Sequence, residues 1–145
     1  MSEMTMDEAI EAAIKLKQDL GDAGLAAAYP ALEKAVRAFE EEGYPLDAIV
    51  PQGADAKLGF SLKTADGRTF FQVYSTLIRK SLCAPGGEFN KLIKSGINSS
   101  VGAVLTAIVT SLGIPLLALG VVIPIAVIIA NTGLDAFCEI NKEDT

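Results

Sequence analysis

Residues 101–130 read VGAVLTAIVTSLGIPLLALGVVIPIAVIIA, inside a longer stretch of 40 residues, 95–134, that contains no Asp, Glu, Lys or Arg. The apolar run exceeds the roughly 18 residues that indicate a candidate transmembrane segment. Because exposing so many aliphatic side chains to water is unfavourable, this segment must leave water. Two destinations fit the sequence, a lipid bilayer or the core of a protein assembly.

Gly113 and Pro115 stand near the middle of the run. Gly favours the end of a helix, Pro favours the start of one, and the residue before Pro avoids the helical conformation. We therefore predict two helices, over about residues 97–112 and 115–131, joined by a tight turn and with a kink at Pro124. One helix over the whole run would be about 45 Å long, well beyond a hydrocarbon core of about 30 Å. A single tilted and kinked span is the competing prediction.

The first predicted helix carries a face of small and hydroxylated residues, which consists of Ser95, Ser99, Ala103, Thr106 and Thr110. Positions three and four residues apart share one face of a helix. Such a face permits close packing of helices in lipid, or it lines a narrow wet pore. The second predicted helix is apolar all round, so we expect it to face lipid or to be fully buried.

The rest of the chain predicts an α+β fold. Residues 1–94 are expected to form a small soluble head, residues 95–134 a hydrophobic helical hairpin, and residues 135–145 an acidic tail. At 94 residues the head buries only a modest core.

The head begins with two predicted amphipathic helices. Thr5 and Glu8 have the spacing of a capping box, which predicts a helix over about residues 5–20. Apolar periodicity predicts a second helix over about residues 23–42, divided at Pro30 or with its main part beginning there.

A β-hairpin is predicted over about residues 57–74. Residues 57–64 alternate apolar and polar side chains, residues 65–68 have the composition of a turn, and residues 69–74 are rich in aromatic and β-branched residues. Two strands alone are marginally stable, so we expect the hairpin to pack on the helices or to pair with another copy. Short helices are predicted over about residues 75–82 and 88–95.

Charge is unevenly distributed along the chain. The net charge of −6 divides into −7 for residues 1–47, +4 for residues 48–94 and −3 for the remainder. No strongly basic face dominates, which excludes nucleic acid as a main partner. The basic residues near the apolar run are Arg79, Lys80, Lys91 and Lys94. If the run enters a bilayer, these residues are expected to meet anionic headgroups and to hold the head in the cytoplasm.

The sequence offers little chemistry for catalysis. It contains no His, no phosphate-binding loop and no dinucleotide fingerprint, so we expect neither an enzyme nor a metal or cofactor site. Cys83 and Cys138 flank the apolar run, and a helical hairpin would bring them together. Because residues 1–20 lack the apolar core of a signal peptide, we expect two reduced thiols, and a disulfide is the alternative in an oxidising compartment.

A charge-free hydrophobic helical hairpin behind amphipathic helices is similar to the pattern of channel-forming colicins. The resemblance covers about residues 97–131, rests on pattern rather than on a motif, and implies insertion into membranes. We therefore expect a small membrane protein that self-associates into a pore or disrupts membrane integrity, as a toxin or defence effector does, with a soluble cytoplasmic form before insertion. Two alternatives are an integral membrane subunit whose head recruits a protein partner, and a soluble homo-oligomeric scaffold that buries its apolar helices.

Overall fold

The computed structural model describes residues 5–21, 24–44, 67–97, 100–115 and 118–143. Within these ranges every regular element is an α-helix. The elements are α1 (Met6–Leu20), α2 (Gly24–Glu41), α4 (Gly67–Leu82), α5 (Glu88–Lys94), α6 (Val101–Leu112), α7 (Leu119–Thr132) and α8 (Leu134–Glu143).

The predicted α+β class is therefore wrong. Residues 69–74, the predicted second strand, belong to α4, which also contains the short helix predicted over residues 75–82. The first strand and the turn, up to residue 66, lie outside the described residues. Two residues of the predicted strand, Phe70 and Tyr74, also lie on one helix face with Ile78 and Leu82, and all four are buried. Their burial along one helix face outweighs a local preference for strand.

The amphipathic helices of the head begin as their sequences indicate. In α1 the Thr5 hydroxyl accepts a hydrogen bond from the Glu8 amide at 3.2 Å, and the Glu8 carboxylate accepts one from the Thr5 amide at 3.3 Å. This capping box was predicted and is confirmed. Pro30, in contrast, does not divide the second helix, because α2 continues through it.

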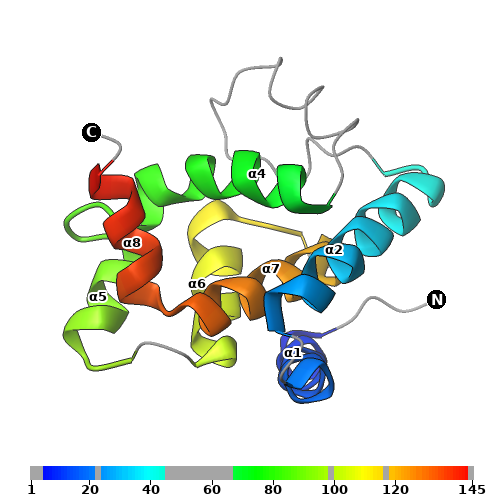
Figure 1. Ribbon diagram of the computed structural model, residues 1–145, viewed down its shortest axis with the longest axis horizontal. Coiled ribbons are helices and arrows are strands. Elements are labelled where there is room, and N and C mark those ends of the chain that lie inside the picture. Colours follow the sequence, from blue (N-terminus) through cyan, green and yellow to red (C-terminus); the bar gives the residue numbers. More distant parts are fainter. Residues whose placement is uncertain (1–4, 22–23, 45–66, 98–99, 116–117, 144–145) are drawn as a thin grey trace.

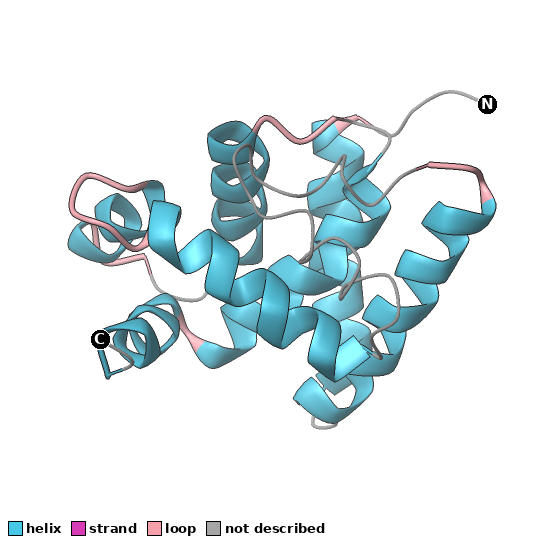
Figure 2. Ribbon diagram, turned by 90° about the horizontal axis from the view of Figure 1, so that it is seen from above, coloured by secondary structure: helices cyan, strands magenta, loops and turns pink. Residues whose placement is uncertain are grey.

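The helix α7 lies at the centre of the fold. It runs through the middle of Figure 1, with α4 above it, α1 below it, α2 on one side and α5 and α8 toward the other end. It packs against α1, α2 and α6 along its length and against α8 at its end. Figure 2, a view from above, shows that the described elements are helices joined by loops. Every residue from 121 to 130 is buried.

The start of α4 lies very close to α2. The Gly67 amide donates a hydrogen bond to the Glu33 carboxylate at 3.1 Å, and a Cβ atom at position 67 would collide with the carbonyl oxygen of Tyr29. Only glycine permits this approach. The contact places α4 across α2 and directs its far end toward α8.

The turn between the two hydrophobic helices depends on one glycine. Gly113 caps α6 in the left-handed conformation with a φ of +63°. We expect Gly113→Ala to lower the free energy of unfolding by about 1–2 kcal/mol, because a Cβ is strained at this φ. The matched control is Gly120→Ala in α7, where a Cβ would meet nothing within 4 Å. Gly120→Ala should raise the free energy of unfolding by about 0.4–1 kcal/mol. Urea denaturation followed by circular dichroism measures both, and equal shifts would contradict this account of the turn.

The burial of Tyr74 predicts that the fold loses stability at alkaline pH. Its ring is fully buried beside Phe70, and burial raises the pKa of its phenol. The folded chain therefore keeps the proton, whereas the unfolded chain releases it above about pH 10. The free energy of unfolding should fall by up to about 1.4 kcal/mol for each pH unit above that point. Urea midpoints between pH 8 and pH 11 test this, and Tyr74→Phe should flatten the decline.

Candidate functional site

The hydrophobic hairpin consists of α6, the turn and α7, and it is the feature from which a function is best sought. The α6 helix starts at Ser100, whose hydroxyl accepts a hydrogen bond from the Ala103 amide at 3.3 Å. Gly113 ends it, and Pro115 lies in the turn before α7. The α7 helix continues through Pro124 and ends at Gly133. The structure therefore has two packed helices in this region rather than one.

The two faces of α6 differ in exposure. Its aliphatic face, which includes Val104, Leu105 and Ile108, is fully buried. Thr106 and Thr110 lie on its exposed side, and the Thr106 hydroxyl donates to the carbonyl of Gly102 at 2.8 Å. Substitutions at the two threonines should therefore leave the contacts of the core intact.

The predicted small and hydroxylated face is only partly assembled. Ala103 is half-buried on α6 beside the two threonines. Ser95 is not on this helix, because it caps the C-terminal end of α5. Ser99 lies outside the described residues. The described part of the face therefore consists of residues on α6, and in this fold Ser95 belongs to a different helix end.

Two amphipathic helices cover the hairpin, and they do so unequally. On α2 the buried side chains are large, including Leu32, Val36 and Phe39. On α1 only two alanines, Ala9 and Ala13, are buried. The larger apolar side chains of α1 pack against the core but stay partly exposed, so α1 buries its apolar face less completely than α2 does.

The seam between α1 and the start of α6 is an open groove. It has a volume of about 640 Å³ and is lined by Ile10, Ile14, Lys17, Gln18, Ser100, Val101 and Gly102. The Ile14 side chain is 42% exposed there. The cover of the hairpin is thus looser on the α1 side than on the α2 side.

A disulfide joins the end of α4 to α8. Cys83 and Cys138 are bonded, with their Cα atoms 5.5 Å apart. The prediction of two reduced thiols was therefore wrong. The hairpin brings the two ends of the apolar run together, as the sequence indicated, and the contact also depends on how α4 and α8 pack. With both sulfurs bonded, neither cysteine offers a thiol for catalysis.

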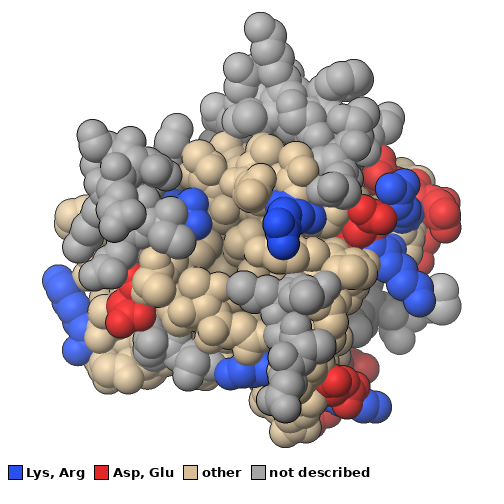
Figure 3. Space-filling model, in the orientation of Figure 1, with Lys and Arg blue, Asp and Glu red and all other residues tan. Residues whose placement is uncertain are grey.

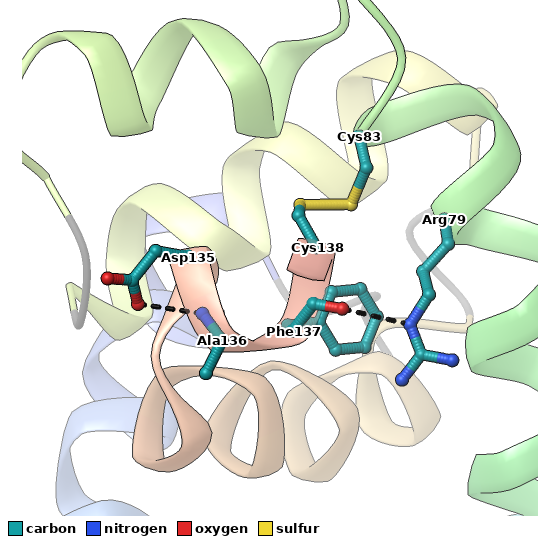
Figure 4. The surroundings of a disulfide bond; sticks show 6 residues. All are labelled: Arg79, Cys83, Asp135, Ala136, Phe137 and Cys138. Atoms are coloured by element: carbon teal, nitrogen blue, oxygen red, sulfur yellow. Dashed lines mark hydrogen bonds between the residues drawn. A yellow bond between two sulfur atoms is a disulfide. The ribbon is translucent and has the colours of Figure 1, made fainter. Parts of the chain in front are cut away.

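A cluster around Phe137 holds α8 beside α4. The Arg79 guanidinium lies 4.4 Å from the centre of the Phe137 ring, and its Nε donates to the Phe137 carbonyl at 3.1 Å. The same ring meets Phe89 of α5 edge-on at 5.8 Å. Figure 4 shows the arginine and the disulfide side by side at this junction. The pairing of the cysteines thus follows from aromatic packing that sequence reasoning did not identify.

The four basic residues predicted to flank a membrane do not act together in this structure. Arg79 packs against α8, and Lys91 and Lys94 are exposed on α5, where Lys91 pairs with Glu88 at 3.3 Å. The side chain of Lys80 lies outside the described residues. The face of the molecule seen in Figure 3 is largely uncharged, with scattered basic side chains. Most of the visible acids lie toward α1 and α2.

Neither the chemistry of the described residues nor comparison with known proteins assigns a function to the chain. Among the described residues, no group of three or more His, Cys, Asp or Glu side chains could hold a metal ion. None of the described helices has the length and apolarity that crossing a bilayer requires. No family model, curated protein or solved structure matches the chain.

We expect the disulfide to contribute substantially to stability. Replacing Cys83 and Cys138 together with Ala should lower the free energy of unfolding by about 2–4 kcal/mol, because the bond restricts a loop of 55 residues in the unfolded chain. Urea denaturation measures this. A dithiol reductant should lower the wild-type midpoint in the same way and leave the double variant unchanged. Equal midpoints for all samples would show that the bond is absent or without effect.

Proposed function

We propose that the chain is a membrane-inserting protein, that the described fold is its form before insertion, and that inserted copies associate into a pore. The observation that carries this proposal is the enclosure of α7, in which every side chain from residue 121 to 130 is buried by neighbouring helices of the same chain. An apolar helix sheathed by amphipathic helices is the arrangement expected of a hydrophobic hairpin stored away from water.

Energetics support the exchange of a protein core for lipid. Lipid tails are about as apolar as leucine side chains, so moving α6 and α7 from the core to a bilayer changes their hydrophobic free energy little. The covering helices also have a place to go, since amphipathic helices bind the headgroup boundary with their apolar faces. The uncovered seam along α1, with Ile14 exposed, is where we place the first opening.

The two hydrophobic helices suit different positions in such a pore. The α7 helix is aliphatic all round and suits contact with lipid. The α6 helix presents Thr106 and Thr110 opposite its aliphatic face, and this side suits contact with another copy or with water in a lumen. Self-association through α6 is therefore part of the proposal.

Burial of α7 within one chain favours this proposal over the two alternatives. A homo-oligomeric scaffold was attractive because the apolar helices needed a partner, and here α1, α2 and α6 supply that partner. An integral membrane subunit would keep the hairpin in lipid permanently and would need no cover.

The disulfide bears on where the protein acts. Disulfides persist in oxidising compartments and are rare where thiol reductants are abundant. We therefore place the folded form on the oxidising side of a membrane, rather than with its head in the cytoplasm as the basic residues alone suggested.

We expect the threonine face of α6 to be needed for leakage but not for membrane binding. Replacing Thr106 and Thr110 with Leu should reduce dye release from liposomes, because it removes the hydroxyls and adds bulk where helices approach closely. Both side chains are exposed in the fold, so the variant should fold normally. Co-flotation with liposomes should persist or increase. Replacing both with Val separates the two causes, since Val has nearly the shape of Thr but no hydroxyl.

The outcomes of this experiment are distinct. Leakage lost with Val assigns the role to the hydroxyls, and leakage kept with Val but lost with Leu assigns it to close packing. If the wild-type chain binds liposomes at high density and never releases dye, the pore proposal is wrong. If it neither binds nor releases dye, insertion itself is wrong.

A further inference from the structure

The disulfide closes a loop that contains both hydrophobic helices. Cys83 directly follows α4, Cys138 lies in α8, and α5, α6 and α7 all lie between them. The two ends of the loop are held with their Cα atoms 5.5 Å apart. Whatever the hairpin does, these ends stay together while the bond is intact.

We propose that this bond obliges α6 and α7 to enter a bilayer as a hairpin, with α4 and α8 remaining on the same membrane face. The inference rests on the proposed function and specifies its topology. A single crossing would place Cys83 and Cys138 on opposite sides of a hydrocarbon core of about 30 Å. Disulfide-bonded residues have Cα atoms at most about 7 Å apart, so the bonded chain cannot make that arrangement.

The length of the uncharged stretch fits two arms. As described, α6 has 12 residues and α7 has 14, which gives helices of about 18 and 21 Å. The stretch without charge has 40 residues, from 95 to 134, enough for about 60 Å of helix. The tip, residues 113–118, takes six of them, which leaves 18 residues for one arm and 16 for the other, or about 27 and 24 Å of helix. Both arms are slightly shorter than the hydrocarbon core of about 30 Å, and a bilayer accommodates such a mismatch by thinning locally.

The distribution of charge also fits a hairpin. The tip, residues 113–118, contains no ionisable side chain. The base carries Lys94 before the stretch and Asp135 after it, both exposed in the fold. Charged groups are costly inside a bilayer, so the tip can cross while both ends of the base remain in water.

A tryptophan probe and terminal tags test this topology. The chain contains no Trp, so Ser111→Trp places a unique fluorophore beside the tip at an exposed position. The protein, with different peptide tags at its two ends, is added to sealed vesicles of phosphatidylcholine and phosphatidylglycerol. Brominated acyl chains should quench the Trp fluorescence. Protease added outside should remove both tags, while a non-reducing gel shows the disulfide intact.

Each outcome has a defined meaning. Quenched Trp with a protected C-terminal tag and an intact bond overturns the hairpin inference and leaves membrane insertion standing. Trp fluorescence that is never quenched overturns the proposed function, and this inference with it. Both measurements use a chain that retains its disulfide, so they do not depend on the folding of a destabilised variant.

The matched control replaces Cys83 and Cys138 with Ala in the same background. Once the bond is gone, a fraction of inserted chains should have a C-terminal tag that protease cannot reach. If the C-terminal tag stays fully accessible to protease in the folded double variant, the charges of the C-terminal tail set the topology. The role assigned to the bond is then wrong.

Discussion

The fold depends on one constraint, which is that α7 has no polar side and must be enclosed on all sides. A helix with an apolar stripe needs one neighbour, whereas α7 needs several. It obtains them from the two amphipathic helices α1 and α2, and from α6, to which it is tied by the turn at Gly113. The hairpin partner α6 covers only one side of α7, so α1 and α2 are needed to cover the others.

Local signals in the sequence were sufficient where a feature is decided within a few residues. The capping box at Thr5, the glycine that ends α6 and the apolar character of α7 are all of this kind. The strand predicted over residues 69–74 failed because the same side chains satisfy two patterns. Phe70 and Tyr74 belong to an aromatic run that favours a strand, and they also lie four residues apart on a helix. Burial against the rest of the fold decides between these readings, and a short window does not contain that information.

The disulfide was missed for a related reason. Two cysteines 55 residues apart can meet only if the elements that carry them are packed together. That packing is produced by Phe137, which lies against Arg79 on α4 and against Phe89 on α5. The expectation of reduced thiols rested on the N-terminal sequence, which carries no information about this contact. The sequence indicated a hairpin that could bring the two cysteines together, but it did not show that they are bonded.

The unequal cover of the hairpin connects the fold to the proposed insertion. Burying a large apolar side chain contributes about 1.5–3 kcal/mol, and α2 buries Leu32, Val36 and Phe39 in this way. The α1 helix fully buries only two alanines and its larger apolar side chains are only partly buried, so its removal from the hairpin costs less free energy. Opening should therefore begin at α1 and expose the hairpin while α2 remains attached. The disulfide lies at the other end of the fold, between α4 and α8, so this opening does not require it to break.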